Sequence, residues 1–200
     1  MYIYFRITFC FKNKGAILLC PINFVSKIYF ECWLQMKLSQ LNRPWKNPGD
    51  IFTRWARRSC TSENADTVYS GDIGGGKHND PGGPSNLLCL PSEPQLDKSG
   101  LSAGATGFIY GTEYRTVNGS LWKHLTDNEA PCDVCRSRGR SVVMIPGRNT
   151  CYPGWRVEYS GYLMSGYRNH GHTGNTNAIC IDAEPETTND SDNKHAATSL

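Results

Sequence analysis

Residues 86–94 read NLLCLPSEP, and residues 177–185 read NAICIDAEP. These stretches end two longer blocks, Cys60–Pro94 and Cys151–Pro185, which match each other at one constant offset of 91 positions. Self-similarity at a fixed offset is typical of a duplicated structural unit. Because two copies are too few for a solenoid, we expect one compact domain with pseudo-twofold symmetry.

The composition predicts a mainly β fold. The chain has 200 residues, enough for one domain with a real core, and its 20 glycines, 11 prolines and 10 tyrosines suit short strands and turns better than long helices. Its nine cysteines indicate a disulfide framework if the chain is exported. We therefore expect two similar disulfide-stapled β-rich subdomains, the second of them truncated.

The net charge of +3 is concentrated near the start of the chain. Residues 1–40 hold five basic residues and one acidic residue, whereas the remainder holds 16 basic and 17 acidic residues. No basic patch stands out in the body of the chain, so a nucleic-acid footprint is not supported. We expect no nucleic-acid partner.

Residues 1–40 differ from the rest in composition and show neither a helical nor an alternating period. They contain no clear signal peptide and no apolar run of about 20 residues that could span a membrane. We expect residues 1–49 to be an extension and linker outside the domain. The first β-rich repeat then covers residues 50–140, the second covers residues 141–186, and residues 187–200 form a polar, disordered tail.

Alternating apolar and polar residues predict short strands at corresponding places of the two copies. The expected strands are Ile51–Trp55, Thr67–Ser70, Asn86–Leu90, Phe108–Arg115, Ser141–Ile145, Trp155–Tyr162 and Asn177–Ile181. The second copy has nothing that corresponds to residues 110–135. We therefore expect the second half to lack a strand and a pair of cysteines.

The cysteines of the duplicated blocks allow two pairing schemes. Bridges within each block would join Cys60 to Cys89 and Cys151 to Cys180. Nested bridges would join both Cys60 and Cys89 to the close pair Cys132 and Cys135, leaving Cys151 and Cys180 unpaired. The residues alone do not choose between the schemes.

The order and spacing of several motifs resemble a known family. These motifs are the Cys-x-x-Cys at residues 132–135, MIP at 144–146, CYPGW at 151–155, YSGY at 159–162, RWAR at 54–57, NLLCLP at 86–91 and IYGTEY at 109–114. Over residues 50–186 they resemble the C-terminal non-collagenous domain of short-chain (spongin-type) collagens, which is related to that of type IV collagen. This chain has no Gly-X-Y tract.

The resemblance implies two similar β-rich subdomains and the nested bridges Cys60–Cys135 and Cys89–Cys132. It also implies a secreted, non-catalytic matrix module that forms homo-oligomers, trimers in particular, or networks with other matrix or collagen chains. No cofactor, metal ion or catalytic residue is expected from it.

Two sequence patterns allow a chemical as well as a structural interpretation. Cys132 and Cys135 could be half of a zinc site, but a second pair at suitable spacing is lacking. Residues 71–78, GDIGGGKH, nearly match a phosphate-binding loop, yet His78 stands where a Ser or Thr is needed, and prolines follow. Structural disulfides and a flexible glycine-rich loop are the favoured interpretations.

The alternative function is a secreted carbohydrate-recognition module of lectin type. Glu93-Pro94 and Glu184-Pro185 resemble part of a calcium and sugar motif, but its companion residues are missing, and both pairs fit a shared turn. His170 and His172 offer only two metal ligands. The glycosylation candidates are Asn118 and Asn189. For hydrolysis, no motif fixes a nucleophile and a base.

Overall fold

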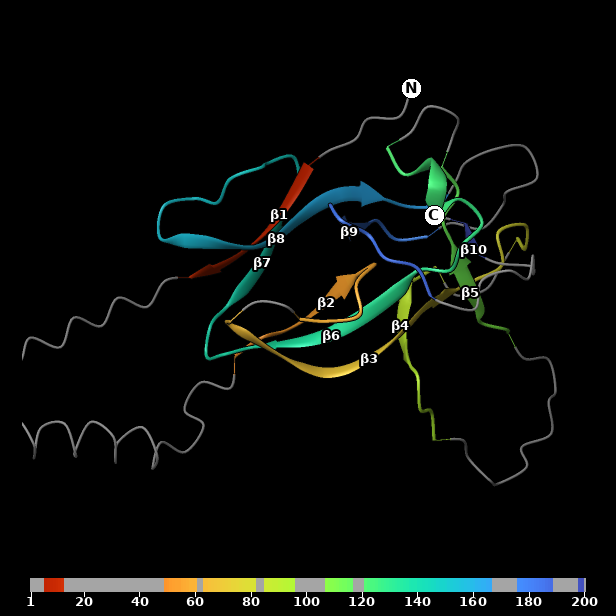
Figure 1. Ribbon diagram of the computed structural model, residues 1–200, viewed down its shortest axis with the longest axis horizontal. Helices are drawn as coiled ribbons and strands as arrows, with labels where there is room; N and C mark the ends of the chain where they lie inside the picture. Colours follow the sequence, from red (N-terminus) through yellow and green to blue (C-terminus); the bar gives the residue numbers. More distant parts are fainter. Residues whose placement is uncertain are drawn as a thin grey trace, which may run out of the picture.

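The computed structural model describes residues 6–12, 49–60, 63–81, 85–95, 107–116, 121–166, 176–188 and 198–199. Within these ranges the chain forms one curled sheet of parallel and antiparallel strands, and the only helical element is the short 3-10 turn η1, Lys123–Leu125 (Figure 1). The expectation of a mainly β fold is confirmed. The expected division into two subdomains is not apparent, because the strands share one sheet.

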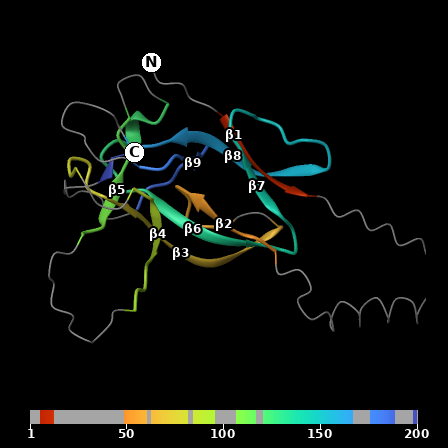
Figure 2. The same ribbon diagram turned by 180° about the vertical axis from the view of Figure 1, so that it is seen from behind.

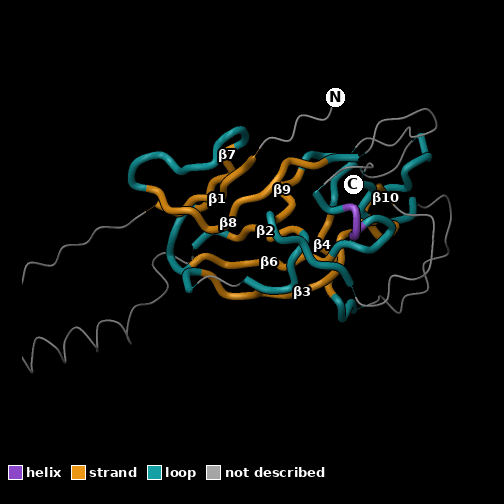
Figure 3. The backbone as a smooth tube through the Cα atoms, turned by 45° about the horizontal axis from the view of Figure 1, so that its top comes forward, coloured by secondary structure: helices purple, strands orange, loops and turns teal. Residues whose placement is uncertain are grey.

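Nine strands follow one another across the sheet in the order β10-β5-β3-β6-β2-β9-β8-β1-β7, and β4 pairs with β3 off this path. They are β1 Arg6–Lys12, β2 Ile51–Trp55, β3 Ala65–Gly75, β4 Leu88–Pro91, β5 Tyr110–Glu113, β6 Pro131–Ser137, β7 Val142–Ile145, β8 Trp155–Met164, β9 Ile179–Asp182 and β10 Thr198–Ser199. Figures 1 and 2 show β7 and β5 at opposite ends of the molecule, and Figure 3 shows the strands side by side along a curved surface.

The two copies form the same hairpin in the same register. In the first copy Gly71 pairs with Pro91 and Ile73 with Cys89, and in the second Gly161 pairs with Asp182 and Leu163 with Cys180. Both glycines are required by close backbone contact. A Cβ atom would lie 1.6 Å from the Leu90 carbonyl oxygen at Gly71, and 1.8 Å from the Ile181 carbonyl oxygen at Gly161.

Strand β1 corrects the expectation that residues 1–49 lie outside the domain. Residues 6–12 pair antiparallel with both β7 and β8. In this segment Ile7, Phe9 and Phe11 alternate with Thr8 and Cys10, which is the pattern of a strand. The alternation covers only five residues, and the partner strands of β1 lie more than 130 positions away in the sequence, so the local pattern alone gives a weak signal. The extension beyond residue 12, as far as residue 48, lies outside the described residues.

Strand β1 occupies in the second copy the place that β6 occupies in the first. β6 lies between β2 and β3, with Cys135 opposite Phe52 and Thr67, whereas β1 lies between β7 and β8, with Cys10 opposite Val143 and Val157. The register of β6 against β3 shifts by one residue, and the register of β1 against β8 shifts by one residue at the corresponding point. The second half is therefore completed by a strand from upstream, and the expected gap does not exist at that place.

The core explains why the copies do not form separate domains. One buried cluster joins Ile73 and Leu87 of the first copy to Ile179 and Ile181 of the second. The other joins Phe9 of β1 to Phe52 and Tyr159, with the Phe9 and Tyr159 rings stacked 4.5 Å apart. Burial of apolar surface is the main source of stability, and both clusters contain residues of the two copies.

Two further boundaries differ from expectation. Strand β3 continues through Gly75, so the glycine-rich residues 71–75 are part of the sheet. In the tail, Thr188 is buried and its backbone N–H donates to the Glu129 carbonyl at 3.1 Å, while β10 pairs parallel with β5. These parts of the tail are ordered by partners in the first copy. Residues 189–197 and 200 lie outside the described residues.

The register equivalence predicts a fourth disulfide. Cys132 lies opposite Gly71, and Ile7 lies opposite Gly161, so Ile7 stands where a cysteine would meet Cys180. We expect Ile7→Cys to form a bridge with Cys180 and to raise the free energy of unfolding by up to about 3 kcal/mol in the loop-entropy model. Peptide mass mapping without reduction detects the bridge.

Thr8→Cys is the matched control, because adjacent residues of a strand point to opposite faces. It should not bridge to Cys180. Recovery of an unbridged Cys180 peptide from the Ile7→Cys variant would contradict the register.

Candidate functional site

The cysteines adopt the nested pairing. Cys60 is bonded to Cys135 and Cys89 to Cys132, with Cα–Cα distances of 5.8 Å and 5.7 Å. The scheme with a bridge within each block does not occur. Because Cys132 and Cys135 are in different disulfides, they are not a pair of zinc ligands.

The second copy corrects the expectation that Cys151 is unpaired. Cys151 is bonded to Cys10 of β1, 141 positions away, with a Cα–Cα distance of 6.0 Å. Cys180 is a free, buried thiol. Burial raises the pKa of this thiol to about 12, which makes it a poor nucleophile. Three disulfides indicate an oxidising environment.

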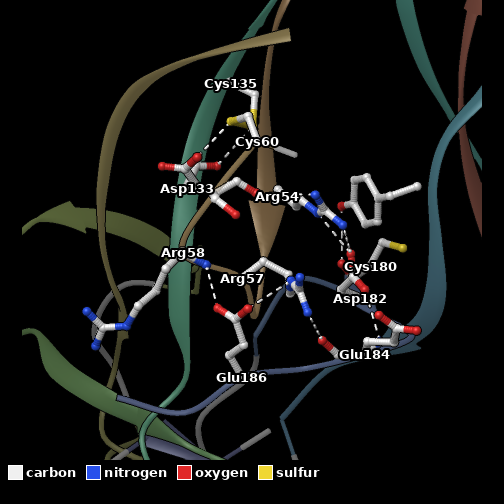
Figure 4. Close-up of polar contacts among 12 residues, drawn as sticks. Arg54, Arg57, Arg58, Cys60, Asp133, Cys135, Cys180, Asp182, Glu184 and Glu186 are labelled. Carbon is white, nitrogen blue, oxygen red and sulfur yellow. Dashed lines mark hydrogen bonds and ion pairs between the residues drawn. A yellow bond between two sulfur atoms is a disulfide. The ribbon is translucent and has the colours of Figure 1, made fainter. Parts of the chain in front are cut away.

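A group of charged residues lies where the two copies meet, at the parallel contact of β2 with β9 (Figure 4). We call this group the β2–β9 junction; it consists of Arg54, Arg57, Arg58, Asp182, Glu184 and Glu186. The strand pairing itself is short, with Trp55 opposite Ile181. Side-chain contacts therefore carry much of the join.

Arg54 and Asp182 form the centre of the β2–β9 junction. The Arg54 Nε and Nη2 atoms lie 2.9 Å and 2.8 Å from Asp182 Oδ2, and the two side chains are only 13% and 7% exposed. Asp182 Oδ1 accepts the backbone N–H of Glu184 at 2.9 Å. The Arg54 guanidinium also lies over the Tyr159 ring, 5.5 Å from its centroid. Each charge thus has an opposite partner within the protein, which offsets part of the cost of burying it.

The edge of the β2–β9 junction is held through the segment that follows β9. Glu186 accepts the backbone N–H of Arg58 at 3.0 Å and lies 3.2 Å from Arg57 Nε. The Glu186 backbone N–H donates to the Ala56 carbonyl at 2.8 Å, and Arg57 Nη1 donates to the Glu184 carbonyl at 2.9 Å. Ala56 has a φ of 69°, a left-handed conformation that turns its carbonyl and the following residues toward this segment.

Two buried tyrosines support the same join. The Tyr159 hydroxyl donates to the carbonyl oxygens of Thr53 and Cys180, both at 3.3 Å, and its pKa is raised well above its usual range by burial. The Tyr114 hydroxyl donates to the Glu186 carbonyl at 2.8 Å, and burial also raises its pKa. Each hydroxyl links strands or segments of the two copies.

The contacts of the β2–β9 junction are all made within the chain, and their geometry is that of a structural join. Carboxylates at Asp182 and Glu186 that could bind a cation already face arginines. Within the described part of the chain, the single group of three potential metal ligands is Cys60, Asp133 and Cys135, and its two sulfurs are bonded to each other.

The remaining predicted candidates are scattered. In the phosphate-loop interpretation, residues 71–75 lie in β3, and none of the residues 76–81 is helical. Glu93 is exposed beyond β4, whereas Glu184 lies in the β2–β9 junction. Asn118, Asn189, His170 and His172 lie outside the described residues. Among the described residues, no helix has the length and apolar character needed to cross a membrane.

No family model, curated protein or solved structure matches this chain.

The buried ion pair predicts a large loss of stability on removal of one partner. Arg54→Ala leaves the Asp182 carboxylate buried without its cation, so the free energy of unfolding should fall by about 3–5 kcal/mol. Urea unfolding measures the loss. Arg115→Ala, which breaks an ion pair with Asp127 whose side chains are 50% and 40% exposed, is the control and should cost less than about 1 kcal/mol. Equal losses in the two variants would contradict the account.

The raised pKa values predict alkaline destabilisation. Tyr159, Tyr114 and Cys180 keep their protons in the folded state at a pH where the unfolded chain loses them. Stability from these groups is therefore complete at neutral pH and declines as the pH rises above about 9. Urea midpoints measured from pH 7 to 11 should fall, and Tyr159→Phe should flatten the decline. A flat profile in the unsubstituted chain would be inconsistent with this burial.

Proposed function

We propose that this chain is a non-catalytic module of the extracellular matrix that associates with further copies of itself or with other matrix chains, as the non-collagenous domain of short-chain collagens does. The three disulfides and the order of the sequence motifs support this proposal. We also propose that the two copies form two similar subdomains about a pseudo-twofold axis. The matched hairpins and the positive φ of both Ala56 (69°) and its counterpart Gly147 (75°) support the symmetry.

One observation carries the proposal of self-association. Residues 182–186 contact Arg54 of β2 and residues 56–58 just after it, and all of them except Glu184 are buried or half-buried. Their counterparts in the first copy, residues 91–95, are all exposed. The same sequence element is thus engaged in one half of the chain and open in the other.

The complementary surface is open as well. Strand β2, whose end and following residues contact residues 182–186, has β7 as its counterpart in the second copy. Among the described residues β7 pairs with β1 alone, and it consists of Val142, Val143, Met144 and Ile145. Val143 and Met144 are 39% and 37% exposed. An apolar edge strand without a charged residue is a template for pairing with another chain.

The two open surfaces suggest a head-to-tail contact. If β7 of one molecule lies parallel to β4 of the next molecule, Pro146 of the first faces Leu90 of the second, just as Trp55 faces Ile181 within the chain. Ile145 and Pro91 then take the places of Arg54 and Asp182, so an apolar contact replaces a buried ion pair and avoids its desolvation cost. Since Pro146 and Pro91 lack an N–H, the contact would rest more on side chains than on strand hydrogen bonds.

A head-to-tail contact uses two different surfaces of each molecule. It therefore leads to a ring if the rotation closes and to a filament if it does not, rather than to a simple twofold dimer. Both outcomes suit a module that aligns or networks matrix chains. The trimer implied by the family resemblance is one such ring.

The lectin-type alternative has less support. Its Glu184-Pro185 motif lies in the β2–β9 junction, where the nearby carboxylates of Asp182 and Glu186 already contact arginines. If calcium ions at millimolar concentration raised the melting temperature, the carbohydrate-recognition function would be favoured.

Sedimentation velocity between about 1 and 100 μM tests self-association. We expect oligomers that grow with concentration, and Met144→Lys should weaken association at least tenfold because it places a charge in the apolar edge. Leu121→Lys is the matched control: Leu121 is 67% exposed and belongs to neither β4 nor β7, so association should be unchanged. A monomer at all concentrations would contradict the proposed function.

Cross-linking tests the geometry separately. A chain with both Leu90→Cys and Pro146→Cys, treated with a short bis-maleimide, should give a ladder of covalent oligomers, whereas either substitution alone should not. Dimers from Pro146→Cys alone would indicate that β7 of one molecule lies beside β7 of another. This result would overturn the head-to-tail contact but leave self-association intact.

A further inference from the structure

Two disulfides of this chain occupy equivalent places but have different neighbours. Cys60–Cys135 and Cys151–Cys10 each join the loop after β2 or β7 to the strand inserted beside it, β6 or β1. In each bridge the inserted cysteine, Cys135 or Cys10, is fully buried, and the other is half-buried. A difference in reduction rate between the two bridges would therefore not come from a difference in their burial.

The first bridge lies against a buried carboxylate. Asp133 Oδ2 is 2.7 Å from Cys60 Sγ, which has no hydrogen to donate in the disulfide (Figure 4). Both carboxylate oxygens accept hydroxyl hydrogen bonds, Oδ1 from Ser70 at 2.6 Å and Oδ2 from Thr67 at 2.8 Å. This acceptor role at both oxygens fits the ionised form, and Asp133 is fully buried, so solvent screens its charge little.

The second bridge has a neutral group at the same place. Asp133 lies opposite Ser70, and Thr8 lies opposite the corresponding Ser160. Thr8 is also fully buried, and its hydroxyl donates to the Arg148 carbonyl at 3.0 Å. The exchange of a carboxylate for a hydroxyl is thus a natural comparison between two otherwise matched disulfides.

We propose that Cys10–Cys151 is a reducible latch that holds β1 in the sheet, and that the Asp133 carboxylate protects Cys60–Cys135 from the same reduction. A carboxylate beside the sulfur repels an approaching thiolate and disfavours the thiolate that must leave. Reduction of the latch leaves β1 without a covalent tie, held by strand pairing and by the packing of Phe9. It also loosens β7, which among the described strands pairs only with β1.

The reductant is a dithiol. Its thiolate attacks Cys151 Sγ, the S–S bond breaks, and Cys10 leaves as a thiolate that takes up a proton. The second thiolate of the reagent then attacks the mixed disulfide, which closes the ring of the oxidised reagent and releases Cys151 as a thiolate that is protonated. Two electrons pass from the dithiol to the protein bond. Cys180 does not compete as a nucleophile because it is buried and protonated.

Timed reduction of the full chain by dithiothreitol, followed by alkylation and peptide mass mapping, measures both bridges in one sample. We expect Cys10 and Cys151 to be labelled about tenfold faster than Cys60 and Cys135. Hydrogen exchange after this first phase should rise in β1 and β7 and not in β6. Equal rates, or faster reduction of Cys60–Cys135, would overturn the proposal.

A neutral phosphine separates charge from access in the unsubstituted chain. It is not repelled by the carboxylate as a thiolate is, and it reduces a disulfide to two thiols with water as the source of oxygen and protons. The rate ratio between the bridges should therefore shrink with the phosphine. An unchanged ratio would show that repulsion of the attacking thiolate by Asp133 does not protect the bridge.

Asp133→Asn provides the direct substitution. It keeps the size of the side chain and removes the charge, so Cys60–Cys135 should be reduced by dithiothreitol at least several-fold faster, with Cys10–Cys151 unchanged as the internal reference. Should the variant not fold, the phosphine comparison still decides. An unaltered rate in a folded variant would refute the protective role.

Discussion

The insertion of one strand between two others, fixed by disulfides, is the constraint on which this structure depends. β6 lies between β2 and β3, and Cys135 and Cys132 tie it to the loop after β2 and to β4. A strand slipped by one residue would move every side chain to the opposite face and separate each sulfur from its partner. The bridges and the strand pairing therefore specify the same register, and β1 repeats this arrangement in the second copy with a single bridge.

A good part of the fold and of the disulfide pairing could be predicted from the sequence. The mainly β fold and the position of β2 follow from local pattern, and the resemblance to short-chain collagens implied the nested bridges at Cys60 and Cys89. β1 was missed because its pattern is short and its partners are distant in the sequence. The Arg54–Asp182 pair was missed because it depends on a parallel contact between the copies. No spacing of charges along the chain signals that contact.

The copies form the same local hairpin but have different surroundings. In the second copy, residues 182–186 are used to hold the chain to itself through arginines and buried tyrosines. In the first copy the corresponding residues are exposed, and in the second copy Val143 and Met144 of the apolar β7 are exposed as well. Differences at a few positions, such as Arg54 against Ile145, thus distinguish an internal join from an apolar edge strand.

Disulfide mapping of the oxidised chain tests the central claim most directly. Proteolysis without reduction, followed by mass spectrometry of linked peptides, should recover Cys60 with Cys135, Cys89 with Cys132, and Cys10 with Cys151. The last pair is decisive, because only a β1 seated between β7 and β8 brings Cys10 to Cys151. Recovery of Cys60 with Cys89 and of Cys151 with Cys180 would contradict the strand insertion and the equivalence of the two copies.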